Sequence, residues 1–240
     1  MEKLANLKQT RSRGADKEKL FEKILDTAKK LFVKEGSVGM RALARELGMS
    51  QANLYNYVES KRELMIAIRS TALKELRKVM ADVNKQKFEN FTSFCLRLAQ
   101  SYLEFASEDY PRFSIWQFIP PPARPVDKIT KKLKEIGPFE RNYQRVNLIN
   151  QGINLIIRKA KEFNVNLEEP ERLFYYMYSV LLGAAKAENE LKLSQIMLKK
   201  KVVDPIYEPT FINPDVLSLE DFRSYVLEEI KYKVEREINR

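Results

Sequence analysis

The sequence predicts an all-α protein with a small helix-turn-helix domain followed by a larger helical domain. Apolar side chains recur at helical spacing along most of the chain, and no stretch of any length reads as a strand. The length of 240 residues suffices for one small and one medium domain. We expect residues 1–16 to form a basic flexible arm, residues 17–60 the first domain and residues 61–240 the second.

The expected arm is polar and carries Lys3, Lys8, Arg11 and Arg13. Two interpretations stay open for it. It is either a solvated, disordered tail or an arm that gains order along the phosphate backbone or in the minor groove of DNA, as in other helix-turn-helix domains.

An amphipathic helix is expected from Lys17 to Glu35, and Gly36 ends it. Its apolar face consists of Leu20, Phe21, Ile24, Leu25, Ala28, Leu31 and Phe32. Farther along, Ser60 and Glu63 have the spacing of a capping box, which predicts the start of a long helix.

The stretch from Met40 to Tyr57 predicts two short helices joined by a tight turn. Gly48 stands where the first of them must stop in a left-handed conformation, which glycine adopts without steric cost. Ser50 is placed to cap the second helix through its hydroxyl. The side chains expected to hold the two helices together are apolar or small: Leu43, Ala44, Leu47, Met49, Leu54 and Tyr57.

The outward face of the second short helix carries amides, a methyl group and a phenol, but no carboxylate. Such groups suit base edges and phosphates in a DNA major groove, so we interpret this helix as a recognition helix. An ordinary helical hairpin is the structural alternative. The predicted DNA contacts are Arg41, Arg45, Ser50, Gln51, Ala52, Asn53, Tyr55, Asn56, Tyr57 and Lys61, with Tyr57 and Lys61 on phosphates and Arg41 and Arg45 either on phosphates or solvated.

Four segments carry a resemblance to a known family: Leu-Phe-Val-Lys-Glu-Gly (31–36), Leu-Ala-Arg-Glu-Leu-Gly-Met-Ser (43–50), Asn-Leu-Tyr-Asn-Tyr-Val (53–58) and Ser-Lys-Arg-Glu-Leu (60–64). Over residues 17–68 the chain resembles the N-terminal domain of TetR/AcrR-family regulators. The resemblance implies a homodimeric, ligand-responsive transcriptional regulator, usually a repressor.

The chain departs from the family pattern in two places. The connection Ser37-Val38-Gly39 is short and lacks the usual Thr or Ser, so Gly39 is expected to cap the next helix, and Val58 replaces the usual Phe.

In the second domain, a long helix is expected from Ser60 to Asn84 and would belong to both domains. A helix with aromatic side chains at helical spacing follows over residues 88–107. Asp109-Tyr-Pro111 would end it, a short aromatic helix would span residues 112–118, and the prolines from 120 to 125 would force an extended loop.

Residues 146–157 and 173–185 contain no charged side chain, so each segment is expected to be a helix buried on most sides. The first carries an amide stripe of Asn147, Asn150, Gln151 and Asn154, and the second carries Tyr175, Tyr176 and Tyr178. Buried amides need hydrogen-bond partners. Either these groups satisfy one another in a packed core, or they line a ligand cavity.

The cavity alternative predicts an apolar small-molecule effector such as a fatty acid or acyl-CoA, because aromatic walls with few polar groups suit such ligands. It would lie between the helices of residues 88–107, 143–163 and 171–193, with no resident cofactor. The candidate lining residues are Tyr102, Phe105, Phe113, Trp116, Phe118, Tyr143, Asn147, Asn150, Gln151, Asn154, Tyr175 and Tyr178, with Arg112, Arg124 or Arg145 as candidates for a charged head group.

The last helix is expected over Leu219–Ile238, after a proline-punctuated stretch at residues 202–216. With the helix of residues 171–193 it would form a four-helix homodimer interface. The uncharged face of residues 173–185 is wider than one neighbour can cover, and Gly183 permits close approach. A two-fold dimer matches a palindromic operator in double-stranded DNA.

The net charge of +10 is concentrated at the start of the chain, where residues 1–70 carry +6 of it. A basic surface suits nucleic acid, although alone it would also suit a membrane or RNA.

The chain has a single cysteine, Cys95, which excludes an intrachain disulfide or zinc cluster. It has no histidine, so the commonest general base is absent. No apolar run reaches bilayer length and no signal peptide opens the chain, so we expect a cytoplasmic protein that does not bind membranes.

The favoured hypothesis is therefore a ligand-responsive, sequence-specific DNA-binding regulator, released from a palindromic operator when its effector binds. The alternative within binding proteins is a constitutive dimeric DNA-binding protein without a ligand. An enzyme with a DNA-binding-like domain is disfavoured by the absence of histidine, of a Gly-rich phosphate loop and of metal-ligand spacing.

Overall fold

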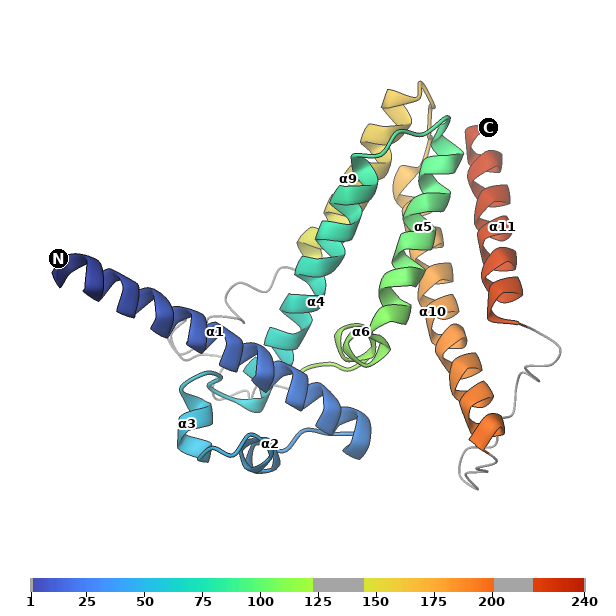
Figure 1. Cartoon of the computed structure of the whole chain (residues 1–240). Helices are drawn as coiled ribbons and strands as arrows, with labels where there is room; N and C mark the ends of the chain where they lie inside the picture. The colour runs from blue at the N-terminus through green and yellow to red at the C-terminus, as the bar shows by residue number, and fades with distance from the viewer. Residues whose placement is uncertain (1, 123–144, 201–217, 240) are drawn as a thin grey trace, which may run out of the picture. The chain divides into compact units, whose positions relative to one another are not determined.

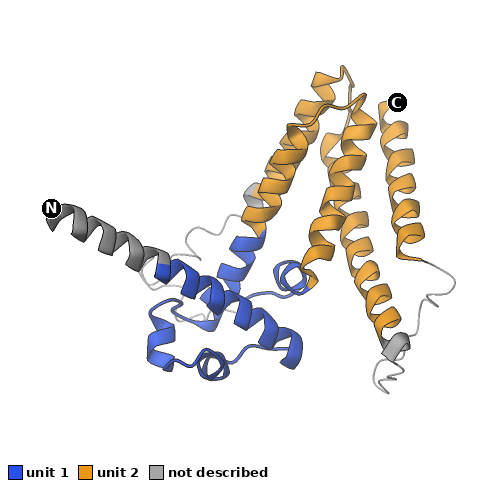
Figure 2. Cartoon of the chain, in the orientation of Figure 1, with its two compact units in different colours: residues 1–72, 111–143 blue, residues 73–110, 144–240 orange. Residues whose placement is uncertain are grey.

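The computed structural model of the chain describes residues 2–122, 145–200 and 218–239, with side chains from residues 16–122, 148–196 and 218–239. Every regular element within these ranges is a helix and none is a strand, so the predicted all-α class is confirmed. The chain divides into two compact units, one of residues 1–72 and 111–143 and one of residues 73–110 and 144–240 (Figure 1, Figure 2).

The first unit contains α1 (Glu2–Glu35), α2 (Met40–Glu46), α3 (Gln51–Tyr55), the start of α4 (Lys61–Asn84) and nearly all of α6 (Tyr110–Gln117). Helix α1 begins at Glu2 rather than at the predicted Lys17, so residues 2–16 are helical and continue directly into the predicted helix. Gly14 is the only glycine in that segment, and a single helical glycine costs only about 1 kcal/mol.

One apolar core joins the helices of the first unit. The predicted face of α1 supplies Ile24, Leu25, Ala28 and Leu31, and each is at most 8% exposed. Leu43 and Leu54, from α2 and α3, are fully buried in the same cluster. Burying a side chain of this size contributes about 1.5–3 kcal/mol, so this core fixes α3 against the other helices.

Helix α6 also packs into this core, which the sequence did not indicate. Its Ile115 is fully buried in the cluster, and the following Ile119 packs against it. The helix begins at Tyr110, so Pro111 lies in its first turn, where the missing amide hydrogen costs nothing. The sequence predicted Pro111 as a breaker and placed the aromatic helix in the second domain.

The second unit contains the rest of α4, α5 (Phe91–Glu108), α9 (Arg145–Glu162), α10 (Pro170–Lys200) and α11 (Leu219–Ile238). Helix α5 packs against α10 and α11, and α9 packs against α10 (Figure 1). The boundary between the units falls inside α4, so this helix is shared between them as predicted.

The ends of α4 and α11 agree with the sequence prediction, whereas α5 and α10 differ from it. Helix α5 begins at Phe91 rather than Phe88, because Asn90 and Ser93 form a capping box there. Helix α10 continues to Lys200, beyond the predicted end at Leu193.

Helix α9 approaches α10 closely at Gly152. A Cβ atom at this position would lie 2.8 Å from Cζ of Phe174 and still closer to Cε2, so the aromatic ring occupies the space that a side chain would need. The face of α9 that is buried contains Leu148, Leu155 and Ile156.

The amide stripe of α9 lies on the opposite side from this apolar face. Asn150, Gln151 and Asn154 are exposed, so the expectation that they are buried is wrong for these three side chains. Their spacing along the helix was interpreted correctly as one face. Lack of charge did not determine that the face is covered, because amides are readily solvated. The side chain of Asn147 lies outside the described residues.

Candidate nucleic-acid interface

The turn between α2 and α3 is built on Gly48, whose φ of +66° lies in the left-handed region. The Gly48 amide donates to the Arg45 carbonyl (3.1 Å), and the Met49 amide donates to the Ala44 carbonyl (3.0 Å). These bonds satisfy carbonyl groups at the end of α2 and fix the direction in which the chain leaves it. The predicted helix-turn-helix geometry is confirmed.

Ser50 starts the recognition helix α3 by accepting a hydrogen bond from the Asn53 amide at 3.1 Å. The N-cap residue of α2 is Gly39, as the sequence predicted; its backbone is extended and it supplies no side-chain cap. Because α3 has only five residues, its start depends strongly on the one hydroxyl cap.

Replacing Ser50 by alanine should lower the free energy of unfolding by about 1 kcal/mol, because an N-terminal amide of α3 loses its partner. Urea denaturation followed by circular dichroism measures this loss. The matched control is Ser50→Asn, whose amide oxygen can cap the helix and should retain nearly full stability. Equal losses in the two variants would contradict the assigned role of the cap.

Helix α3 presents polar side chains on one face and anchors itself by the other. Leu54 is fully buried, whereas Ala52, Asn53, Tyr55 and Asn56 are exposed. Gln51 is half-buried and donates a hydrogen bond from Nε2 to the Tyr55 hydroxyl at 3.1 Å. The exposed amides suit adenine edges and the Ala52 methyl suits thymine, which is the chemistry expected of a recognition helix.

The candidate phosphate contacts lie beside this face. Tyr57 and Lys61 are half-buried, and Lys61 is the first residue of α4. Ser60 caps that helix by accepting a hydrogen bond from the Glu63 amide at 3.1 Å. A helix N-terminus favours a phosphate through its free amides and its dipole. Arg41 and Arg45 are exposed on α2.

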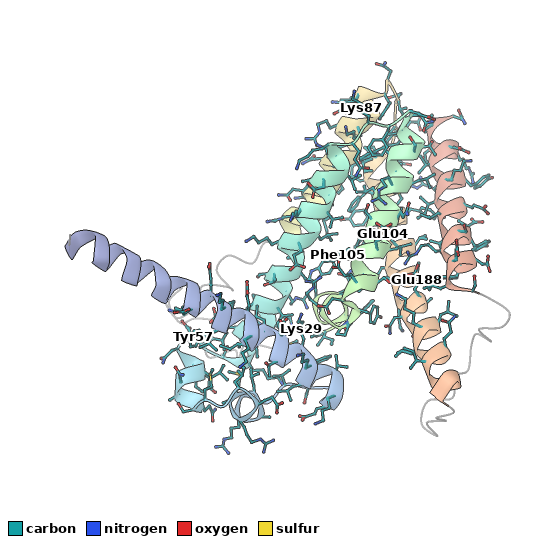
Figure 3. All side chains as sticks on the ribbon, viewed as in Figure 1. Lys29, Tyr57, Lys87, Glu104, Phe105 and Glu188 are labelled. Atoms are coloured by element: carbon teal, nitrogen blue, oxygen red, sulfur yellow. The ribbon has the colours of Figure 1, made fainter. Side chains whose placement is uncertain are left out.

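Lys17 of α1 is a further basic group at this surface, which the sequence did not single out. Its Nζ lies 5.9 Å from the centre of the Tyr57 ring, and the Lys17 side chain is exposed. Tyr57 is labelled in Figure 3. The contact joins residues that are 40 positions apart in the sequence, so no local spacing could indicate it.

Two arginines of α4 bind carbonyl groups at and beyond the end of α6, within the same unit. Arg69 is 3% exposed and donates from Nη1 to the carbonyls of Ile115 (3.3 Å) and Ile119 (2.5 Å). Arg62 donates to the Pro122 carbonyl at 2.7 Å. A guanidinium at a helix C-terminus is favoured by the dipole, so these bonds attach α6 to the helix-turn-helix unit.

The candidate effector-lining residues differ in burial. Four of them are buried: Tyr102, Phe105, Phe113 and Trp116. Tyr178 is half-buried. The exposed ones are Phe118, Asn150, Gln151, Asn154 and Tyr175. Tyr143 and the side chain of Asn147 lie outside the described residues.

The structure brings two groups of these residues together. Within the second unit, the Tyr102 ring of α5 lies edge-on to Tyr178 of α10, with centroids 6.4 Å apart. Within the first unit, Phe113 lies 5.7 Å from Trp116 and 6.1 Å from Phe118. Tyr175, in contrast, lines a groove between α10 and α11.

Two side chains whose buried donor atoms lack a hydrogen-bond partner among the described residues add to the candidates for ligand contact. Nε and Nη2 of Arg77, on α4, are buried in this way, and so is Nε1 of Trp116. The free-energy cost of burying guanidinium N–H groups is offset only when a hydrogen-bond acceptor or an anion binds them. Arg77 was not predicted, since on the sequence it resembles any charged residue of an amphipathic helix.

Other classes of site find little support in the part of the chain that the structure describes. No cluster of three His, Cys, Asp or Glu residues there could hold a metal ion. Burial raises the pKa of the Cys95 thiol, which keeps it protonated and unreactive at neutral pH. None of the described helices combines the length and apolar character that crossing a bilayer requires.

Comparison with known proteins identifies the first unit. Residues 24–68 match the family model described as bacterial regulatory proteins, tetR family. A search among curated proteins finds no match.

Several solved structures share the fold along most of the chain. PfmR, a TetR-family regulator from Thermus thermophilus, is 21% identical with a TM-score of 0.55, and 87% of this chain and 97% of that chain are covered. AibR, solved in complex with isovaleryl coenzyme A and operator DNA, is 13% identical with a TM-score of 0.56, over 88% and 97% of the two chains. The ketosteroid regulator KstR2 of Mycobacterium tuberculosis is 12% identical with a TM-score of 0.52, over 87% and 93%.

At such identities the structural likeness establishes the fold, and the family match covers the helix-turn-helix, including Gly48, Ser50 and α3. The predicted resemblance is thereby confirmed. Residues 24–68 thus form a helix-turn-helix domain of the bacterial tetR regulatory family, and the chain shares the fold of solved TetR-family regulators.

Proposed function

We propose that the protein is a homodimeric repressor that binds a palindromic operator and leaves it when an apolar, anionic small molecule binds the second unit. The observation that carries the DNA-binding half is the face of α3. Gln51, Asn53 and Tyr55 project from a helix whose Leu54 is fully buried, so the base-reading groups are held on a rigid support. Pre-positioned polar groups favour sequence readout over diffuse charge attraction.

The dimer is proposed on the surface of α10 and α11. Three tyrosines there are largely exposed: Tyr175 by 49%, Tyr225 by 60% and Tyr232 by 65%. Tyr175 and Tyr232 line a groove of about 630 Å³ between the two helices. Exposed aromatic side chains gathered on adjacent helices are typical of a protein interface. A two-fold copy of this surface would give the predicted four-helix interface.

Exchanging Tyr225 and Tyr232 together for glutamate should convert the dimer into a monomer, because the interface would then bury two unpaired charges. Sedimentation at micromolar concentration measures the mass. The control is Val33→Glu, which places a charge at an apolar residue of α1 that is 61% exposed. The proposed interface is wrong if the double variant stays dimeric, or if Val33→Glu dissociates the protein equally.

The effector is proposed to be a fatty acid or an acyl-CoA. Tyr102 and Tyr178 supply aromatic surface, and the buried guanidinium edge of Arg77 suits a carboxylate or phosphate. AibR, which shares the fold, was solved with isovaleryl coenzyme A and operator DNA. Arg77 joins the arginines suggested by the sequence as a candidate for the charged head group, because its buried Nε and Nη2 lack a hydrogen-bond partner among the described residues. Arg124 and the side chain of Arg145 lie outside the described residues.

Release is proposed to act through α4, which spans both units, and through the bonds of Arg62 and Arg69 to the α6 region. A shift of α4 changes the separation of the two recognition helices, which must lie about 34 Å apart to meet successive major grooves. A coupling of about 1–3 kcal/mol suffices to lower operator occupancy strongly.

The test begins with selection of an operator from random DNA, followed by operator binding in the presence of acyl-CoAs and fatty acids of graded length. We expect a palindromic site, release by at least one chain length, and loss of that response in Arg77→Met. Operator binding that no member of the series alters would favour the constitutive, ligand-free alternative. In vitro transcription from the selected site distinguishes repression from activation.

A further inference from the structure

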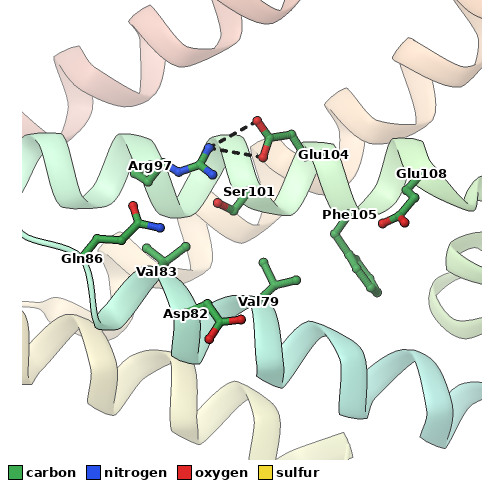
Figure 4. A pocket seen from close by; sticks show the side chains of 9 residues that line it. All are labelled: Val79, Asp82, Val83, Gln86, Arg97, Ser101, Glu104, Phe105 and Glu108. Carbon is green, nitrogen blue, oxygen red and sulfur yellow. Dashed lines mark hydrogen bonds and ion pairs between the residues drawn. The ribbon is translucent and has the colours of Figure 1, made fainter.

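A second groove of the second unit lies between the end of α4 and α5 (Figure 4). Its volume is about 260 Å³, and its lining comes from α4, α5 and the connection between them. Val79 and Val83 of α4 face Phe105 of α5 and supply an apolar floor. Tyr102, Tyr178 and Arg77, which are proposed to contact the effector, do not line this groove, so the proposed function does not explain it.

The rim of the groove is acidic. Asp82, Glu104 and Glu108 line it together with one guanidinium, that of Arg97, which gives a formal charge of −2. Arg97 binds both carboxylate oxygens of Glu104 (3.2 and 3.3 Å), whereas Glu108 is exposed and accepts no hydrogen bond from the described residues.

Asp82 also has an existing partner, Lys85, at 2.9 Å. The side chains of Lys85 and Asp82 are mostly exposed, at 73% and 52%, and an exposed pair of this kind is weak enough to exchange for a ligand. The hydrogen bond from Lys85 lowers the pKa of Asp82, so the carboxylate is ionised at neutral pH.

Ser101 provides an independent indication of a ligand. It lines the groove from α5, is only 3% exposed, and its Oγ has no hydrogen-bond partner among the described residues (Figure 4). A buried hydroxyl normally has a hydrogen-bond partner, so a ligand N–H that enters the groove would supply the hydrogen bond that Ser101 Oγ lacks.

The spacing of the acidic groups decides which cation fits. No three of the described acidic, His or Cys side chains form a group that could hold a metal ion, so Asp82, Glu104 and Glu108 do not form one. Separated carboxylates with an apolar floor between them match a ligand that has separated positive charges and an apolar chain.

We propose that this groove binds a linear aliphatic polyamine. One ammonium group is held by Glu108 and the other by Asp82, while the methylene chain lies over Val83 and Phe105. An amine N–H of the ligand donates to Ser101 Oγ. Binding at this site does not depend on DNA or on the proposed effector.

Isothermal titration of the full chain without DNA tests the proposal, with spermidine, butylamine and MgCl₂ compared at equal ionic strength. We expect spermidine to bind about tenfold more tightly than butylamine, because only spermidine can satisfy both acidic ends with charge-assisted bonds. Equal affinities for spermidine and butylamine, or equal affinities for spermidine and Mg²⁺, would overturn the proposal.

Two variants locate the site. Glu108→Gln and Ser101→Ala should each weaken spermidine binding about fivefold. The control Glu190→Gln removes one exposed acidic charge on α10, where Glu190 pairs with Lys186 at 3.9 Å, and should leave binding unchanged. An equal loss in Glu190→Gln and Glu108→Gln would show only general charge attraction and would overturn the site.

The same alanine variant separates ligand binding from a structural role. Because Ser101 Oγ has no partner among the described residues, Ser101→Ala should keep or raise the melting temperature of the free protein. A lower melting temperature, with unchanged spermidine affinity, would assign the hydroxyl to the fold and contradict the proposal.

Discussion

Replacing Gln51, Asn53 and Tyr55 together by alanine is expected to abolish sequence-specific DNA binding. Each lost base contact should cost about 1–3 kcal/mol, so the three together remove most of the difference between operator and random DNA. Binding to random DNA should persist, because Arg41 and Lys61 are untouched and phosphate attraction is independent of sequence. Competition between the selected operator and random duplex at fixed salt measures the ratio of the two affinities.

The triple variant should remain folded, since the exchanged side chains lie on the outer face of α3 while Leu54 remains buried in the core. The matched control is Lys61→Ala, which should weaken operator and random DNA nearly equally and reduce the salt dependence of binding. An unchanged footprint in the triple variant would contradict the assignment of α3 as the reading helix.

Replacing Arg223 by alanine is expected to destabilise the second unit by about 3–5 kcal/mol, because it leaves a buried carboxylate without its counter-charge. Arg223 of α11 donates from Nε and Nη2 to the two oxygens of Glu188 on α10, at 2.8 and 2.6 Å. The side chain of Glu188 is only 3% exposed, whereas that of Arg223 is 25% exposed. The pair therefore links α11 to α10 through a carboxylate that is buried between the helices.

The control for this loss is Lys85→Ala, which breaks a pair between side chains that are 73% and 52% exposed and should cost at most about 1 kcal/mol. Urea denaturation at one protein concentration measures both variants. A second comparison, Glu188→Leu with Arg223→Met, should recover much of the stability because neither charge is then buried. Similar losses of unfolding free energy in Arg223→Ala and Lys85→Ala would contradict the claim that burial of Glu188 makes its pair with Arg223 costly to break.

The pH dependence of this pair has a defined sign. The hydrogen bond with Glu188 raises the pKa of Arg223, although burial opposes the shift. A basic group with a raised pKa contributes its full stability below its unfolded-state pKa and loses it only as the pH rises through the folded value. For arginine that window lies far above neutral pH, so the contribution through Arg223 is constant across the physiological range.

Local features of the candidate site were predictable from the sequence because neighbouring residues produce them. The left-handed turn at Gly48 and the Ser50 cap each involve groups within a few positions, and both are present. The bounds of α4 followed from apolar periodicity and from the cap at Ser60, and those of α11 from apolar periodicity. The cap of α11 by Ser218 is a finding of the structure.

What the tertiary structure alone decided are the contacts between distant segments. Packing placed α6 in the core of the helix-turn-helix unit through Ile115, and it positioned Lys17 over Tyr57. It also exposed the α9 amides, because a run without charges fixes which residues share a face but not whether another helix covers that face.

The sequence by itself thus determined the all-α class, the Ser50 and Ser60 caps and the polar reading face of α3, since these depend on backbone conformation and periodicity over a few turns. The burial of Glu188 with Arg223, the unpartnered edge of Arg77 and the groove around Ser101 depend on which helices meet in space. The physical reason is that desolvation of a polar group is set by all of its neighbours, and most of those neighbours are remote in the chain.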